Sequence, residues 1–231
     1  MQNMSEDAAL TLSRLPLFPL QTVLFPGGLL PLRIFEVRYL DMVQRCHREG
    51  APFGVVCLEQ GSEVTTAPRP GTDRAAETLH SVGTLAHIEH LEQARPGLLH
   101  VRCRGGQRFR VQQRDKLRHG LWVADVELLP HDLTTPVPEE LASTVISLQR
   151  LIDSLRAQAT GAEQLPITPP YHWQDAGWVA NRWCELLPVG NELKQRLMSL
   201  DAPLLRLELV SDVLEKRSEE HTSELQSPCN L

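Results

Sequence analysis

The hydrophobic pattern of the chain changes near residue 130, and this change constrains the fold more than any other feature of the sequence. From Leu15 to about Leu129, short alternating or apolar runs are broken by Gly and Pro, as is typical of a β-barrel or β-sandwich. Beyond Pro138 the apolar residues recur at helical spacing instead. The sequence therefore predicts an α+β protein in which an antiparallel β-barrel is followed by an α-helical bundle.

The barrel is expected to contain a hairpin and several further strands. Leu98–Arg104 and Gln107–Arg114 alternate with period two, and the pair Gly105-Gly106 between them suits a tight turn. This alternation places Leu99, Val101 and Cys103 on the core face and the arginines on the outer face. The other predicted strands are Leu15–Leu20, Leu29–Ile34, Phe53–Leu58, Val82–Leu91 and Leu121–Leu129.

One helix is expected to interrupt the strands. Tyr39, Met42, Val43 and Cys46 have the spacing of one helical face, and Gly50 supplies a C-terminal stop. The polar stretch from Gln60 to His80 has no periodicity, so it is predicted to be a long mobile loop.

Helices dominate the second part of the chain. One carries Leu141, Leu148 and Ile152, and others are expected to be capped by Asp175 and Asn191 or to start near Pro203. The predicted division is a barrel at residues 10–130 and a helical bundle at 136–216. Residues 217–231 are expected to be a disordered, non-native tail, because Arg217–Pro228 is similar to a translated DNA-sequencing adapter.

Composition and charge exclude several classes of protein. The net charge of −6 argues against a surface built wholly for nucleic acid. The five cysteines contain no CxxC pair, so neither a zinc site nor a disulfide framework is predicted. No apolar run approaches the roughly 18 residues that span a bilayer. We therefore expect a cytoplasmic protein that does not interact with a membrane.

Several runs in the chain resemble one known family. LPLFPL at Leu15–Leu20, VLFPG at Val23–Gly27 and PLRIFEVRY at Pro31–Tyr39 are similar to the beginning of the N-terminal, substrate-binding domain of Lon proteases. FGVV, VGT, GQRFRV and LLP follow in the order and spacing of that family. The resemblance covers roughly residues 13–214. It implies a barrel of the PUA-like type followed by a helical bundle, in a stand-alone form without the ATPase and protease domains.

This resemblance implies a binding function rather than an enzymatic one. The implied function is a non-catalytic module that binds exposed or unfolded segments of client proteins, with a separate protease as a further candidate partner. The chain contains no G-x-x-x-x-G-K-[ST] motif, and the Ser and Lys of the Lon protease domain have no counterpart in it. No catalytic residue, cofactor or metal ligand is therefore predicted.

The candidate peptide-binding residues lie at and just after the end of a predicted strand at the barrel rim, where loops on a rigid scaffold often bind partners. They are Arg33, Phe35, Glu36, Arg38 and Tyr39. A structural interpretation competes for the last three, since a carboxylate in a first helical turn favours the helix dipole and pairs with a nearby arginine. The groove between barrel and bundle is a further expected part of the binding surface.

RNA is the alternative partner, because PUA-like barrels also bind RNA. Its candidate surface is a strip formed by Arg33, Arg102, Arg104, Arg108 and Arg110, for which a solvated strand face is the favoured explanation. Two further features have open interpretations. His87 and His90 are expected on opposite strand faces, and the aromatic loop Tyr171–Trp173 is either a partner anchor or packing over the bundle.

Overall fold

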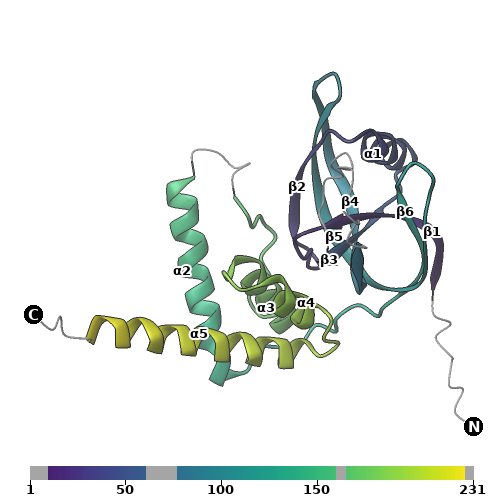
Figure 1. The fold of residues 1–231 in the computed structure, drawn as a ribbon. Helices are drawn as coiled ribbons and strands as arrows, with labels where there is room; N and C mark the ends of the chain where they lie inside the picture. Colours follow the sequence, from purple (N-terminus) through teal and green to yellow (C-terminus); the bar gives the residue numbers. More distant parts are fainter. Residues whose placement is uncertain (1–9, 61–76, 160–164, 227–231) are drawn as a thin grey trace, which may run out of the picture. The chain divides into compact units, whose positions relative to one another are not determined.

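The computed structural model describes residues 10–60, 77–159 and 165–226, although the side chains of residues 60 and 218–226 are outside that description (Figure 1). The chain divides into two compact units. The first unit comprises residues 1–131 and 189–198, and the second comprises 132–188 and 199–231. Within the described ranges, every helix is too short or too polar to cross a lipid bilayer.

Six strands form the first unit. They are β1 (Thr11–Leu20), β2 (Leu29–Ile34), β3 (Phe53–Gln60), β4 (Thr78–Arg95), β5 (Leu98–Lys116) and β6 (Trp122–Leu128). Their order is β2-β5-β4-β3-β1-β6, and a pairing of β5 with β6 closes a ring. Closure satisfies the strand edges within the ring. The predicted α+β barrel is thus confirmed, with one difference, because β1 pairs with β3 in parallel.

Strand β2 lies outside the closed ring and pairs with β5 alone among the described strands (Figure 1). Its bounds agree with the prediction from the sequence. Pro31 lies in the middle of β2, opposite Arg102. Because proline has no N–H to donate, it is tolerated where a strand forms the edge of a sheet. Pro31 therefore suits this edge and limits strand addition along it.

The predicted turn at Gly105-Gly106 is wrong, because β5 continues through both glycines. A Cβ atom on Gly105 would lie 2.1 Å from the carbonyl oxygen of Phe25, and one on Gly106 would lie 2.5 Å from Nε2 of His87. Close approach of the Phe25 backbone therefore requires Gly105, whereas Gly106 lies against a histidine side chain, and neither glycine forms a turn. The hairpin turn lies at Pro96-Gly97 instead, where Gly97 has a φ of 78°.

The long strands β4 and β5 contain irregularities that sequence periodicity does not reveal. A register shift between Ile88 and His90 pairs His87 with Arg104 and His90 with Arg102. Both histidines therefore lie on the same face, contrary to the prediction from strict alternation. The described residues contain no group of three or more side chains suited to hold a metal ion.

Helix α1 (Val37–Glu49) packs against the barrel as predicted, and Gly50 ends it in the left-handed conformation with a φ of 62°. Its buried residues are Tyr39, Met42, Val43 and Cys46. They join a core cluster that includes Phe18, and the Tyr39 ring stacks on the Phe18 ring at a centroid distance of 4.1 Å. Cys103 is fully buried, as its predicted place on the core face requires, and burial raises the pKa of its thiol to about 12.

Glu77, the residue before β4, fastens the start of that strand to the end of β5 and the start of β6. Its carboxylate accepts hydrogen bonds from Nζ of Lys116 at 2.8 Å and from Nε1 of Trp122 at 2.9 Å. Burial alone would raise the pKa of Glu77, but these hydrogen bonds and the charge of Lys116 outweigh it and lower the pKa below its ordinary value.

We predict that this carboxylate makes the stability of the barrel decrease at low pH. A lowered folded-state pKa stabilises the protein above the ordinary glutamate pKa of about 4.3, and this stabilisation is lost as the pH falls through the folded-state value. Urea unfolding of Glu77→Gln should therefore show a smaller decrease in stability below about pH 5 than the parent. The matched control is Glu59→Gln, which alters an exposed residue of β3. Equal decreases for Glu77→Gln and the parent would contradict the prediction.

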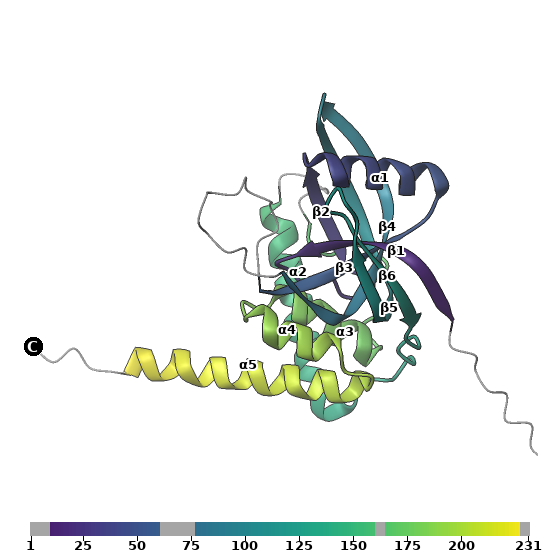
Figure 2. The same ribbon diagram turned by 45° about the vertical axis from the view of Figure 1, so that its right-hand side comes forward.

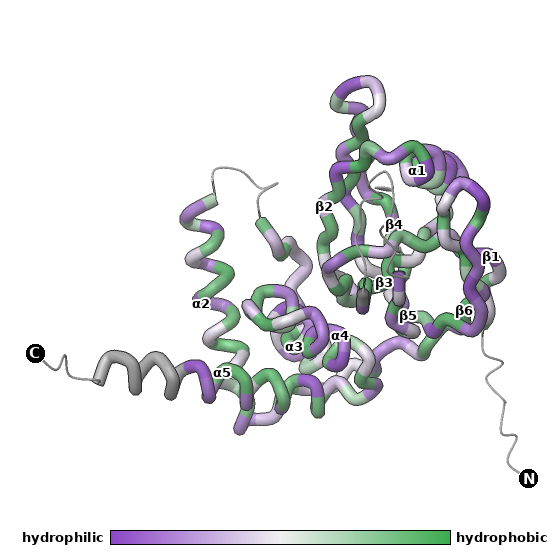
Figure 3. Tube along the Cα trace, in the orientation of Figure 1, coloured by the Kyte–Doolittle hydropathy of each residue, from purple (hydrophilic) through white to green (hydrophobic). Residues whose placement is uncertain are grey.

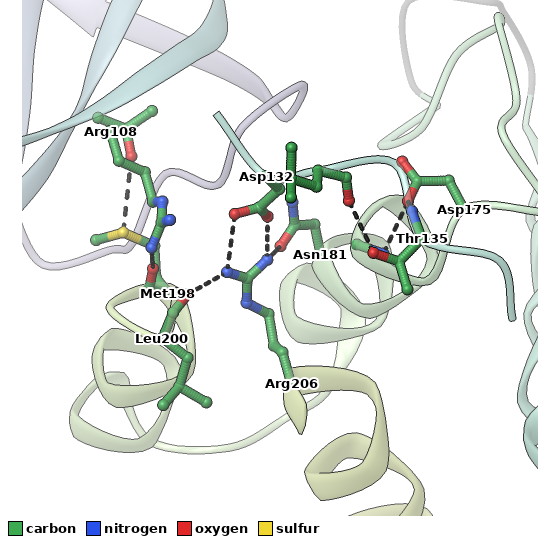
Figure 4. Close-up of polar contacts among 11 residues, drawn as sticks. Arg108, Asp132, Thr135, Asp175, Asn181, Met198, Leu200 and Arg206 are labelled. Atoms are coloured by element: carbon green, nitrogen blue, oxygen red, sulfur yellow. Dashed lines mark hydrogen bonds and ion pairs between the residues drawn. The ribbon is translucent and has the colours of Figure 1, made fainter. Parts of the chain in front are cut away.

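Helix α4 (Asn191–Met198) belongs to the barrel unit, although its periodicity alone groups it with the other C-terminal helices. The side chain of Gln195 donates to the carbonyl oxygen of Val82 at 2.9 Å. Arg108 is only 3% exposed and donates to the carbonyl oxygen of Met198 at 3.0 Å (Figure 4). The prediction that Arg108 lies on the outer face is therefore wrong, because this arginine fastens α4 to the barrel.

The second unit contains α2 (Ala142–Gln158), α3 (Ala176–Leu186) and α5 (Pro203–Gln226), with a short 3-10 helix η1 (Glu139–Leu141) before α2. Polar and apolar residues alternate along α2 in Figure 3, as expected of an amphipathic helix. The predicted cap Asp175 accepts a hydrogen bond from the N–H of Gly177 at 3.1 Å. Trp183 of α3 donates to the carbonyl oxygen of Thr144 in α2 at 3.0 Å.

The C-terminal helix differs from the expectation of a disordered tail. Helix α5 continues to Gln226, past the expected boundary at Arg217 (Figure 2). No Gly or Pro occurs between Pro203 and Pro228. A helix that is already formed therefore meets no strong breaker over this stretch, since adding a residue to a helix is far easier than nucleating one.

Candidate functional site

A recess at one end of the barrel unit brings together two segments that are distant in the sequence. It has a volume of about 680 Å³ and is lined by Arg33 and Phe35 at the end of β2 and by the turn Arg95–Leu98 between β4 and β5. Register explains this placement, because Arg33 pairs with His100, Ile34 with Leu99, and Arg95 with Leu98. The β4–β5 hairpin extends beyond the rest of the barrel unit in both views (Figures 1 and 2). We call this cavity the hairpin recess.

One exposed apolar side chain, Phe35, lines the hairpin recess, and a second, Val37, follows two residues later in the sequence. Phe35 is 57% exposed and Val37 is 72% exposed, at the junction between β2 and α1. A single exposed apolar residue is common on protein surfaces, but neighbouring ones next to a cavity are typical of binding sites. Leu98 adds a half-buried apolar wall to the same recess.

Three of the five predicted site residues form a cluster of internal contacts instead. Arg38 pairs with Glu36 at 2.9 Å, donates to the carbonyl oxygen of Gly120 at 2.8 Å, and lies 4.5 Å from the centroid of the Tyr39 ring. Tyr39 itself is only 2% exposed. These contacts support the structural interpretation of Glu36, Arg38 and Tyr39. Arg33 and Phe35 are the two predicted residues that the structure places in the hairpin recess.

A second cavity of about 620 Å³ lies between α1, the start of β1 and the β5–β6 connection. Its lining includes Arg38, Arg45 and Glu49. The charges of these side chains are directed toward neighbouring side chains, because Arg45 pairs with Glu49 at 2.9 Å and Arg38 pairs with Glu36. This cavity therefore has less capacity than the hairpin recess to select a partner by charge.

The predicted arginine strip is interrupted in the structure. Arg102 and Arg104 both pair with Glu89, the first at 3.7 Å. Arg108 is buried under α4, so it separates Arg110 from the others. The contacts favour a solvated strand face, whose charge Glu89 neutralises in part, over a continuous phosphate-binding surface.

The aromatic loop of the second unit packs on its own helix. The rings of Tyr171 and Trp173 stack at a centroid distance of 5.1 Å, and Trp173 meets Trp178 of α3 edge to face at 5.0 Å. Arg156 lies 4.8 Å from the centroid of the Tyr171 ring. These contacts support the packing interpretation.

Sequence reasoning missed Arg95 and Leu98 as site residues. The incorrect prediction of a turn at Gly105-Gly106 explains the omission. In that prediction the hairpin starts at Leu98, and Arg95 lies in a connection before it. The run Arg95-Pro96-Gly97 is itself a turn signal and could have identified the hairpin tip.

The fold defines a class of protein, a mixed β-barrel with one flanking helix followed by C-terminal helices. A crystal structure of a Lon N-terminal domain protein from Xanthomonas campestris has this fold. Its TM-score is 0.66 at 31% sequence identity, over 87% of this chain and 98% of that chain. The N-terminal domain of a Mycobacterium avium complex Lon protease shares the fold at 16% identity and a TM-score of 0.52, over 88% and 97% of the two chains.

Sequence comparison identifies the family. Residues 14–216 match the sequence model of the ATP-dependent protease La (LON) substrate-binding domain. The chain therefore belongs to the Lon substrate-binding domain family. It is 30% identical over 154 residues to a Lon protease of Phenylobacterium zucineum and 27% identical over 229 residues to one of Paraburkholderia phytofirmans. The alignments cover 66% and 92% of this chain but only 17% and 26% of those proteases.

Proposed function

We propose that this chain is a non-catalytic protein-binding module that holds exposed or unfolded segments of client proteins. Membership of a substrate-binding domain family supports a protein ligand. The alignments with Lon proteases cover only 17% and 26% of those proteins. A separate protease remains a candidate partner of the client-bound module.

The observation that carries this proposal is the exposed Phe35, which lines the hairpin recess and is followed two residues later by the exposed Val37. Both side chains are more than half exposed, although they lie between a buried strand end and a buried helical face. Keeping them in water forgoes the free energy of burial, which is about 1.5–3 kcal/mol for a large apolar side chain. A client segment that covers them would recover part of this free energy, and aromatic anchors of this type often dominate a binding interface.

We expect Phe35→Ser to weaken the binding of an unfolded client about tenfold, since loss of an aromatic anchor costs more than about 1.4 kcal/mol. The measurement is fluorescence anisotropy with a labelled, reduced and carboxymethylated protein that cannot refold. Leu10→Ser is the matched control, because Leu10 is 70% exposed but does not line the recess.

The same titration distinguishes client binding from the RNA alternative. Apolar capture of the unfolded protein should persist at high salt, whereas binding of single-stranded RNA through phosphates should fall steeply with added salt. Equal binding of the unfolded protein by the parent and by Phe35→Ser would mean that the client does not bind at the hairpin recess. Salt-sensitive binding of RNA without binding of the unfolded protein would favour the alternative function.

A further inference from the structure

We infer that the hairpin recess selects segments in which a carboxylate lies next to an apolar side chain. This inference rests on the proposed function and specifies the chemistry of its ligand. Its basis is the combination of charge and apolar surface at one site. Arg33 and Arg95 supply the cations, and Phe35 and Leu98 supply the apolar wall.

The two arginines reach the hairpin recess from different strands. Arg33 lies near the end of β2 and Arg95 is the last residue of β4, with the first residues of β5 between them. Both side chains are exposed and both line the same cavity, whose lining contains no acidic residue. The charges of the lining residues therefore add rather than cancel.

Several other barrel arginines differ from this pair because they form ion pairs within the protein. Arg38 pairs with Glu36, Arg45 with Glu49, and Arg104 with Glu89. Within the part of the chain that the structure describes, Arg33 and Arg95 form no ion pair with an acidic side chain. In a protein with a net charge of −6, two arginines without a described acidic partner at one cavity give it a local sign opposite to that of the whole chain.

A carboxylate fits this arrangement better than a nucleic-acid backbone. A guanidinium presents paired N–H donors that match the two oxygens of a carboxylate. A nucleic-acid backbone would require a row of further cations, but Arg102 and Arg104 next along β5 are paired with Glu89. The apolar wall adds a second requirement, so the favoured ligand is an extended peptide in which Asp or Glu, or a free C-terminal carboxylate, adjoins an apolar residue.

The test uses the full chain and three fluorescent ten-residue peptides. Each has a Gly-Ser background with a central Phe-X-Leu, where X is Asp, Asn or Lys, and an amidated C-terminus. We expect the Asp peptide to bind the parent about fivefold more tightly than the Asn peptide for each arginine engaged, because a favourable exposed ion pair contributes up to about 1 kcal/mol. This preference should shrink at high salt. An Asn peptide with a free C-terminus shows whether a terminal carboxylate substitutes for the side chain.

Charge reversal supplies the decisive variants. Arg33→Glu and Arg95→Glu should each abolish the preference for Asp over Asn, and the double variant should prefer Lys. Arg110→Glu is the matched control, since Arg110 is an exposed arginine of β5 outside the recess. Cooperative unfolding of each variant, measured by circular dichroism, confirms that the fold is intact.

The outcomes separate the inference from the function on which it rests. Equal binding of the Asp and Asn peptides by the parent would overturn the carboxylate preference while leaving the proposed function in place. Failure of the parent to bind any peptide or unfolded protein would overturn the proposed function. The labelled Asp peptide is also displaced with two competitors, an eight-residue uridine oligomer and the unlabelled Asp peptide. If the oligomer displaces it at the lower concentration, the recess binds nucleic acid instead.

Discussion

Replacing Arg206 by methionine should destabilise the second unit by about 3–5 kcal/mol, because it leaves a carboxylate that has lost its buried cation. The Arg206 side chain is 0% exposed. Its Nη1 lies 2.6 Å from Oδ2 of Asp132 and donates to Oδ1 of Asn181 at 2.9 Å, and its Nη2 donates to the carbonyl oxygen of Leu200 (Figure 4). Within the second unit, one guanidinium of α5 thus connects Asp132, Asn181 of α3 and the segment before α5.

Urea unfolding followed by tryptophan fluorescence measures this effect in the second unit. That unit contains Trp173, Trp178 and Trp183, three of the four tryptophans in the chain. The Asp132→Leu/Arg206→Met double variant should regain much of the lost stability, since replacing both members of a buried pair by apolar residues is often close to neutral.

The surface control is Arg150→Met, which alters an exposed residue of α2 and should change stability by less than about 0.5 kcal/mol. Two results would count against the role assigned to Arg206. One is a loss below about 1 kcal/mol, which is the range of an exposed ion pair. The other is a double variant that is no more stable than Arg206→Met alone.

We expect Gly105→Ala to destabilise the barrel by about 3 kcal/mol or more, because β5 has no room for a side chain at this position. An added Cβ would meet the Phe25 carbonyl oxygen at 2.1 Å. The two segments cannot separate easily, since the N–H of Gly105 donates to the carbonyl oxygen of Gly28 and the N–H of Gly27 donates to that of Gly105, each at 2.8 Å. Phe25 itself is fully buried.

Two other glycines provide graded controls for this prediction. Gly97 has a φ of 78° but no heavy atom within 4 Å of an added Cβ, so Gly97→Ala should cost only the strain of a left-handed residue, about 1–2 kcal/mol. Gly190 has open space around it and no positive φ, so Gly190→Ala should be close to neutral. Urea unfolding measured by circular dichroism gives the order. A larger loss of stability for Gly97→Ala than for Gly105→Ala would contradict the prediction and favour the hairpin turn that the sequence suggests at Gly105-Gly106.

The candidate site was only partly predictable from the sequence, because two of its residues reach it only through strand pairing. Arg33 and Phe35 stand out in the sequence because they lie at the end of a clear strand and just before a clear helix. Arg95 and Leu98 join them only through the β2–β5 and β4–β5 registers. Tyr39 does not join the site, because its helical spacing places it on the buried face of α1. The groove expected between barrel and bundle stays a prediction.

Local patterns by themselves determined the elements of this protein. The alternation of Leu29–Ile34, the i, i+3, i+4, i+7 spacing that ends at Gly50, and the cap at Asp175 are set by interactions within a few residues, and all three appear as expected. Only the tertiary structure decided that Gly105 is required by Phe25, that Arg108 is buried under α4, and that Arg206 meets Asp132. Each of these depends on contact between segments far apart in the sequence, and short-range periodicity carries no information about such contacts.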